Sequence, residues 1–318
     1  MSSRQFTQFG GSGEIVTLDD INEYDDLPPL AEIDSPDVYE IRTGELGTDY
    51  LVPMQDGSTD FNQWYSLVDG QIIRAIPDSV VNNLDHAHLI DEGEGAVLNP
   101  AGVDDGLQDI ASSFNGSPTW VEDDDAPFGW KIDMSASDGW RGDSQYPDAD
   151  IDDKISVCGW INLDGVSVSN NLSVFFGSHE DMGSLNSSGD GIVAALYDND
   201  ELSVEVSDGG SFRAETSPTY GVNVSDENVV FFGGSQEVDG ENTILDIHVW
   251  NETSHIGDDQ NEDHFTSVSD WSNQFPQSPD SISDSNIDPA DGEEMFFGVA
   301  FDKLPKSAFE DIWNDTKP

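Results

Sequence analysis

The chain has 318 residues, of which 66 are acidic and 10 are basic, so its formal net charge at pH 7 is −56. Ten basic residues are too few to form a phosphate-binding patch, which excludes nucleic acids and anionic membrane surfaces as partners. The 36 % content of hydrophobic residues, with eight tryptophans, is enough for a folded core and excludes an intrinsically disordered chain.

The first part of the chain combines a polar segment with short β patterns. Residues 1–25 are polar apart from one apolar pair and predict an extended N-terminal arm. Residues 26–75 contain apolar and polar alternation bounded by Asp-Gly and Gly turns, which is the signal of strands and hairpins. The strands that we expect in this small β module are residues 37–44, 50–54 and 63–68.

The next segment, residues 76–103, is rich in turn-forming residues and predicts a connector with one helical turn at residues 78–84. We therefore expect a domain boundary near residue 104. An extended lead followed by hairpins and then a linker resembles the small attachment modules at the N-termini of viral tail-fibre and spike proteins, a resemblance that covers about 50 residues. That resemblance implies that residues 26–103 attach the chain to other proteins and make it oligomeric.

Residues 104–318 show short strand patterns at a spacing of about ten residues, which favours an antiparallel sandwich or jelly roll. One helix is expected at residues 307–313, and residues 251–292 read as a long irregular segment with functional potential. The strands that we expect are residues 155–161, 172–176, 192–197, 202–206, 229–232, 244–250 and 295–301.

Several of these stretches also resemble a known family. The runs FNGSPTWV, FGWKID and ISVCGWINL, followed at the end by FGVAFDKL and SAFEDIW, are similar to the laminin-G-like members of the concanavalin A-like domains. The resemblance covers residues 105–315 and departs from the family at an acidic insert, Asp123 to Asp125, and at residues 251–292. It implies an all-β fold: a two-sheet jelly roll with a short C-terminal helix, which usually binds carbohydrate or protein.

Catalysis is not supported by the motifs. Glucanases on this sandwich place three acids along one strand, but Glu32 and Asp34 precede the sandwich, and Glu205 lacks the central Asp. Cys158 lies in an apolar strand pattern typical of a small core residue. We therefore expect that the protein is not an enzyme.

Two segments are candidates for ligand recognition. Sugars stack on aromatic rings while polar neighbours bind their hydroxyl groups, so aromatic and charged residues among turn residues are of interest. The alternative for the first segment is that its tryptophan is part of the core. The candidate ligand-binding residues are Trp140, Arg141, Asp143 and Tyr146 in the first segment, and His255 and Trp271 in the second.

Calcium is the candidate metal, because the rim loops of such sandwiches often supply carboxylates and carbonyls. The candidate calcium ligands are Asp123, Asp124, Asp125, Asp258 and Asp259. A solvated acidic surface explains the same residues, and we expect no cofactor to be required. A second metal hypothesis, chelation by His86 and His88, competes with their being two polar residues in a connector.

The charge balance is typical of proteins adapted to high salt. Only five lysines are present, and at 1 M salt the Debye length falls to about 3 Å, which screens carboxylates from one another. We infer a halophilic source, with a calcium-loaded acidic protein as the alternative. No apolar run is long enough to span a bilayer, no secretory segment follows Met1, and a single cysteine allows no intramolecular disulfide.

These observations together lead to a hypothesis of function. A binding sandwich without an export signal is typical of a virion protein, which is assembled in the host cytoplasm. We expect a structural protein of a haloarchaeal virus, a capsid vertex turret or spike or a tail fibre, that binds a host surface glycan or surface-layer protein. It would form a trimer or pentamer and contact other virion proteins through residues 1–103. The alternatives are a decoration protein without host binding and an extracellular halophilic carbohydrate-binding or carbohydrate-active protein.

Overall fold

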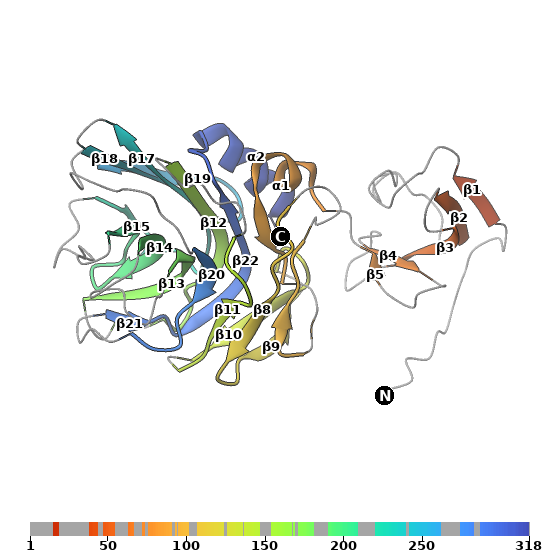
Figure 1. Ribbon diagram of the computed structural model, residues 1–318, viewed down its shortest axis with the longest axis horizontal. Coiled ribbons are helices and arrows are strands. Elements are labelled where there is room, and N and C mark those ends of the chain that lie inside the picture. Colours follow the sequence, from red (N-terminus) through yellow and green to blue (C-terminus); the bar gives the residue numbers. More distant parts are fainter. Residues whose placement is uncertain are drawn as a thin grey trace. The chain divides into compact units, whose positions relative to one another are not determined.

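The chain forms two compact units, Met1–Ile76 and Pro77–Pro318 (Figure 1). The computed structural model describes residues 15–18, 38–43, 47–54, 63–66, 72–73, 76–90, 93, 95–101, 107–123, 126–135, 137–146, 154–166, 168, 171–180, 190–208, 220–239, 242–261, 274–282 and 287–317.

The first unit is a small β-sheet. Its strands follow chain order, with β1 parallel to β2 and the other neighbours antiparallel. Tyr39 and Leu51 face each other across β2 and β3, and both side chains are buried. The expected strands of this region are β2, β3 and β4. The bounds are β1 (Ile15–Leu18), β2 (Val38–Thr43), β3 (Gly47–Met54), β4 (Gln63–Ser66) and β5 (Ile72–Ile73).

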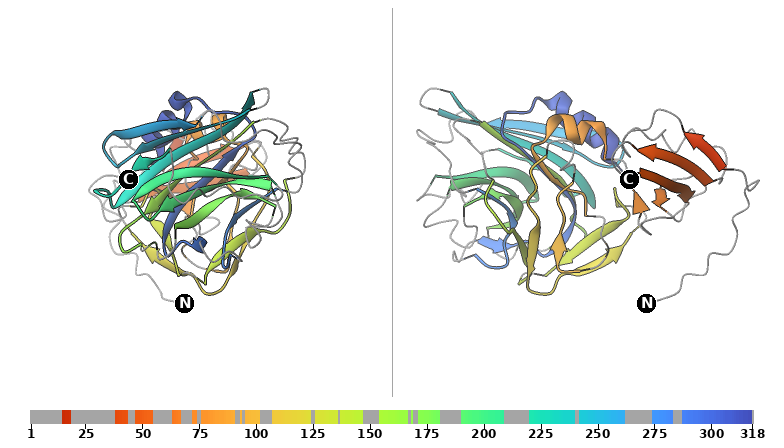
Figure 2. Two further views of the ribbon diagram at one scale, coloured as in Figure 1. Left: turned by 90° about the vertical axis from the view of Figure 1, so that its left-hand side faces the viewer. Right: turned by 45° about the vertical axis from the view of Figure 1, so that its right-hand side comes forward.

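The second unit is a sandwich of two mainly antiparallel sheets. We call one the helix-side sheet, because α1 (Asp78–Asn83) and α2 (Lys306–Thr316) lie side by side against its outer face (Figures 1 and 2). Its strands run in the order β19 (His255–Asn261), β18 (Asn242–Trp250), β17 (Val229–Asp239), β12 (Lys154–Asn162), β22 (Gly292–Ala300), β10 (Trp130–Met134) and β9 (Thr119–Glu122), with β6 (His86–His88) also paired to β22.

We call the other the far sheet. Its one parallel pairing among the described strands joins β13 to β21. The all-β sandwich with a short C-terminal helix agrees with the expected fold class. The strand order of the far sheet is β16 (Val222–Asn223), β15 (Glu201–Asp208), β14 (Asp190–Tyr197), β13 (Leu172–His179), β20 (Phe275–Ser278), β11 (Gly139–Gly142), β8 (Ser112–Asn115) and β7 (Val97–Leu98), with β21 (Ile287–Pro289) paired to β13.

The main core fills the space between the two sheets. Alternate residues of each strand point inward, since successive side chains of a strand face opposite sides. In β12, for example, Ile155, Val157 and Ile161 belong to this core, while Cys158 and Trp160 face outward. The outward face is buried as well, because Trp160 packs on Phe231 and donates a hydrogen bond to Thr316 of α2.

Helix α2 covers the helix-side sheet with an apolar face made of Phe309, Ile312 and Trp313, all of them buried. The Phe309 ring packs directly on the backbone of Gly233 in β17. A Cβ added at this glycine would lie 2.3 Å from the ring. The absence of a side chain at this position therefore lets the helix approach the strand closely.

The domain division differs from the expected one. The second unit begins at Pro77, some residues before the boundary that we expected near residue 104. The described residues from Pro77 to Ala101 belong to the sandwich because β6 pairs with β22, and because Ile90 and Leu98 are part of the core. The turn residues that suggested a connector, such as Gly93 and Gly95, make bends between these short core-forming pieces.

The segment 251–292 was expected to be irregular, but its described residues include the strands β19, β20 and β21. Strand β19 was missed because it lies at the end of the sheet and consists mostly of polar, partly or fully exposed residues. Such an edge strand lacks the apolar alternation on which sequence-based prediction depends.

The tight contact below α2 gives a test of this packing. Replacing Gly233→Ala should lower the free energy of unfolding by about 1–3 kcal/mol, because the new methyl group would push Phe309 and α2 away from the sheet. Urea denaturation in molar salt measures the change. The control is Ser235→Ala on the same strand and face, which removes a buried hydroxyl and should have little effect. Equal losses in the two variants would contradict close docking of α2.

Candidate functional site

The first predicted recognition segment is divided between the core and the surface. Trp140 on β11 is fully buried, and its Nε1 donates a hydrogen bond to Glu294 at 2.6 Å. Tyr146 is 5 % exposed and packs against His86 and Phe301. These two aromatic residues are therefore core residues rather than exposed ligand-binding ones, because they point inward between the sheets.

Arg141 and Asp143 of the same segment lie on the outer face of the far sheet. The Arg141 guanidinium lies 4.1 Å from the ring centroid of Phe275 and donates to the Glu180 carbonyl at 3.0 Å. Arg141 is the cross-strand neighbour of Ser113, whose hydroxyl donates to Asp143 at 2.7 Å. We call Ser113, Arg141, Asp143 and Phe275 the Arg141 face.

The chemistry of the Arg141 face suits a polar ligand. A guanidinium has five N–H donors, the Asp143 carboxylate only accepts, and the Phe275 ring adds an apolar surface. The Arg141 side chain is half-buried and the Asp143 side chain is exposed. Donor and acceptor therefore lie close together on this face, next to a partly buried ring that the guanidinium covers on one side.

The second predicted segment lies on the other side of the sandwich. His255 of β19 packs edge-on against Trp250 on the outer face of the helix-side sheet. Its Nδ1 lies 3.4 Å from the Lys306 ammonium of α2. Trp271 lies outside the described residues. The structure thus does not combine His255 with the Arg141 face in one site.

The acidic residues predicted as calcium ligands have other roles or positions. Asp123 is paired with Lys131 at 2.6 Å, and Lys131 also contacts Glu293; Asp124 and Asp125 lie outside the described residues. Asp258 and Asp259 are consecutive on β19, so their side chains face opposite sides of the strand. They therefore cannot share one ion, and Asp259 accepts a hydrogen bond from the Gly221 N–H instead.

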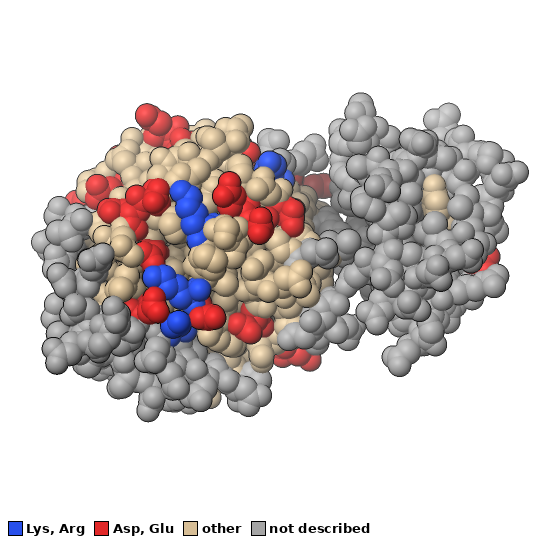
Figure 3. Space-filling model, turned by 90° about the horizontal axis from the view of Figure 1, so that it is seen from above, with Lys and Arg blue, Asp and Glu red and all other residues tan. Residues whose placement is uncertain are grey.

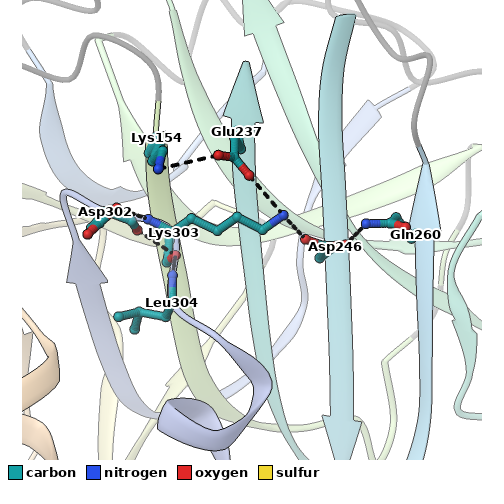
Figure 4. A network of polar contacts seen from close by, with 8 residues as sticks. Lys154, Glu237, Asp246, Gln260, Asp302, Lys303 and Leu304 are labelled. Atoms are coloured by element: carbon teal, nitrogen blue, oxygen red, sulfur yellow. Dashed lines mark hydrogen bonds and ion pairs between the residues drawn. The ribbon is translucent and has the colours of Figure 1, made fainter. Parts of the chain in front are cut away.

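Lysine and acid side chains also form a network on the outer face of the helix-side sheet (Figure 4). Lys303 contacts Glu237 at 3.3 Å and Asp246 at 2.5 Å, and Lys154 contacts Glu237 at 3.3 Å. Seen from above, lysine and arginine side chains lie among acidic ones and form no broad basic patch (Figure 3). The lysine partners hold the pKa of Glu237 below its usual value despite partial burial.

His86 and His88 are fully buried in β6, with their Nε2 atoms 3.2 Å apart. Each Nδ1 faces a main-chain carbonyl, of Gln108 and of Asn99, and a carbonyl only accepts, so each Nδ1 carries the ring proton. Burial lowers the pKa of His86 well below its usual value and that of His88 to about 4. The pair is therefore neutral and belongs to the core, so the description of these histidines as two polar residues in a connector is wrong.

Glu294 is the titratable group that sequence reasoning missed. It lies in the core, where it accepts hydrogen bonds from Trp140 and, at 2.8 Å, from Ser278. Burial raises its pKa to about 7, although both hydrogen bonds favour the charged form. No sequence signal marks it, because Glu293 and Glu294 look like any other acidic pair in this chain.

The other residues considered for catalysis are also buried. Glu205 accepts hydrogen bonds from Tyr197 and Ser203 at 2.7 and 2.9 Å and is 2 % exposed. Burial raises the pKa of the Cys158 thiol well above its usual value, so it is not a ready nucleophile. Glu32 and Asp34 lie outside the described residues.

Comparisons with known proteins give matches of fold only. No protein family and no curated protein matches the chain. Among solved structures, it is similar to the binding domain of botulinum neurotoxin DC in complex with SialylT, with 12 % identity, a TM-score of 0.45, and 75 % of this chain and 52 % of that chain covered.

Two further structures resemble it. Domain 4 of AbnA, an extracellular arabinanase of Geobacillus stearothermophilus in complex with arabinotriose, has 12 % identity, a TM-score of 0.42, and coverage of 74 % and 98 % of the two chains. Trypanosoma rangeli sialidase in complex with sialic acid has 8 % identity, a TM-score of 0.45, and coverage of 87 % and 44 %. The chain spans about half of the neurotoxin binding domain and less than half of the sialidase.

Within the described part of the chain, neither helix has the length and apolar character needed to cross a lipid bilayer.

The buried carboxyl gives a pH test of the core. A Glu pKa raised from 4.5 to about 7 lowers the free energy of unfolding by about 3 kcal/mol as the pH rises from below 4.5 to above 7. Glu294→Gln keeps an acceptor for Trp140 and does not ionise. Its free energy of unfolding relative to the wild type should therefore rise between about pH 5 and about pH 8. Urea denaturation in molar salt at both pH values measures this difference, and a pH-independent difference would contradict a neutral Glu294.

Proposed function

We propose that the chain is a structural protein of a haloarchaeal virion, a turret, spike or tail fibre, and that its sandwich binds glycans of the host surface through the Arg141 face. The observation that carries the binding proposal is that Arg141, unlike most of the lysines, contacts a ring and a main-chain carbonyl instead of a carboxylate. Lys131, Lys154, Lys303 and Lys306 are each paired with a carboxylate, but Arg141 stacks on Phe275 and donates to a main-chain carbonyl. Within the described part of the chain, no carboxylate forms an ion pair with the other donors of Arg141, so a ligand would not have to break one there.

A glycan suits this face for chemical reasons. Sugar hydroxyls accept from a guanidinium and donate to a carboxylate, and the faces of sugar rings stack on aromatic rings. The proposal depends on Arg141 and its neighbours on the far sheet.

The virion role is supported by the composition and the two-unit organisation. A net charge of −56 is tolerated where molar salt screens the repulsion among carboxylates. A small β unit joined to a larger sandwich suits division of labour between attachment and recognition. On this proposal the first unit contacts other virion proteins and makes the protein oligomeric, and the sandwich carries no catalytic activity.

Binding to host cells tests the Arg141 face. In molar salt, the full chain should bind host cells saturably, and soluble surface glycan should compete. Arg141→Ala should weaken binding about tenfold or more, because charge-assisted hydrogen bonds to the ligand are lost. Lys154→Ala is the matched control, since it removes one positive charge from the other side of the sandwich.

Equal binding by the two variants would exclude the Arg141 face. A wild-type chain that does not bind would favour the decoration protein, and release of cleaved sugar would favour the carbohydrate-active alternative.

Assembly tests the first unit. A chain lacking residues 1–76 should be absent from purified virus particles while the remaining sandwich stays folded, since the second unit is compact by itself. Mass spectrometry of particles and circular dichroism of the truncated protein measure the two properties. Normal incorporation of the truncated chain would refute the attachment role of the first unit.

A further inference from the structure

Three side chains that can bind a metal meet on the outer face of the helix-side sheet, near its end strand. They are His248 on β18 and His255 and Asp258 on β19. One ring nitrogen of each histidine and one oxygen of Asp258 lie within 4.8 Å of one another. His248 and Asp258 face each other directly across the two strands, so the sheet itself brings them together.

A β-bulge adds the third side chain to this cluster. His255 and Asp258 are three residues apart and would face opposite sides of a regular strand. The register between β18 and β19 shifts at this point: Val249 pairs with Gly257, but Trp250 pairs with His255, which leaves Ile256 as an extra residue in β19. As a result, Ile256 packs against the core, and a Cβ on Gly257 would also point inward, toward Val222. Ile256 and Gly257 thus both face inward. His255, which precedes them, therefore lies on the same outer face as Asp258. Bulges commonly re-aim side chains in this way next to functional sites.

Both imidazoles have a nitrogen available for a ligand. His248 Nδ1 and His255 Nε2 are buried without a hydrogen-bond partner in the described part of the chain. A neutral imidazole keeps the lone pair with which histidine binds a metal.

We propose that His248, His255 and Asp258 form a binding site for Zn²⁺, with further coordination positions open to solvent. Two nitrogens and one carboxylate oxygen match Zn²⁺ and other late first-row ions, whereas Ca²⁺ takes oxygen ligands. Donors bound to one tetrahedral zinc ion lie about 3.3 Å apart. The 3.7 Å between His255 Nε2 and Asp258 Oδ1 therefore needs only small side-chain rotations, and both side chains are partly exposed.

Lys306 at the start of α2 competes with the metal. Its ammonium lies 3.4 Å from His255 Nδ1 and 3.6 Å from Asp258 Oδ1, so it already gives the cluster one positive charge. When zinc binds His255 Nε2, the ring proton must move to Nδ1, where it faces this ammonium. Zinc and Lys306 thus exclude each other, and Lys306, which is 41 % exposed, can turn toward solvent.

The proposed site lies next to α2, so a bound ion should stabilise the fold. The ring of His248 contacts Phe309 of α2 at 6.1 Å between centroids, and Glu310 of α2 is close enough to raise the pKa of His255. The site therefore lies where the end of the sheet meets the C-terminal helix. An ion that binds only the folded state raises the unfolding temperature, by an amount that grows with the logarithm of the ion concentration divided by Kd.

Calorimetric titration of the tag-free, metal-stripped full chain in molar salt tests the proposal. Zn²⁺ should bind at one site per chain, and Ca²⁺ should not compete for it. Co²⁺ in place of Zn²⁺ should give the d–d absorption of a site with imidazole ligands. Zinc should also raise the unfolding temperature. Binding of zinc without a defined stoichiometry, or displacement by Ca²⁺, would overturn the proposal, because it would indicate ions condensed on carboxylates.

Four variants sharpen the test. His255→Gln and Asp258→Asn should each weaken zinc binding about 100-fold or more, since changes even to residues that only support metal ligands cost 10–100-fold. Asp259→Asn is the matched control, because it removes the same charge next to the site and should leave the affinity nearly unchanged. Lys306→Gln should tighten binding, a gain that a misfolded variant cannot produce. Equal effects of Asp258→Asn and Asp259→Asn, or unchanged binding in both His255→Gln and Lys306→Gln, would refute the site.

Discussion

The structure depends on keeping its interior uncharged while its surface carries an extreme negative charge. With 66 acidic residues, any carboxylate that ionised inside the sandwich would meet both desolvation and the repulsion of its neighbours. The core does contain titratable groups around Trp140, namely Glu294 and His88. Their pKa values, about 7 and about 4, leave both groups neutral over the interval between these values. Hydrogen bonds from Trp140, Ser112 and Ser278 satisfy these groups without adding charge.

The basic side chains differ in their partners. Most lysines are paired with carboxylates, and Lys303 holds two acids of neighbouring strands at once. Arg141 is different, because it stacks on an aromatic ring of the far sheet. Lys306 is different as well, because its partners are potential metal ligands. The two positions lie on opposite faces of the sandwich, so glycan binding at one and metal binding at the other would not compete for space.

Sequence patterns predicted the strands in which apolar residues form a run or alternate with polar ones. Strands β12, β17 and β18 and the C-terminal helix were expected from these patterns, and β12 is buried on both faces. The same reasoning failed for β6 and for β19, since one is three residues long and the other is a polar edge strand. It also failed for side-chain direction: Trp140 and Arg141 are adjacent in sequence, but only the strand register shows that the first points inward and the second outward. Contacts such as His248 with Asp258 depend on strand pairing and on a bulge, which composition and spacing do not reveal.

The polar character of β19 has a consequence for how copies of the protein can meet. An end strand offers unpaired main-chain groups to which a strand of another chain could add. Here Asp258 and Asp259 are exposed along that strand, so two copies approaching edge to edge would bring four carboxylates together. At the opposite end of the same sheet, β9 is four residues long and ends with the exposed Glu122. Continuous growth of the sheet from chain to chain is disfavoured at both ends. Copies that met through the helix-side sheet would therefore have to do so through side chains rather than through main-chain pairing.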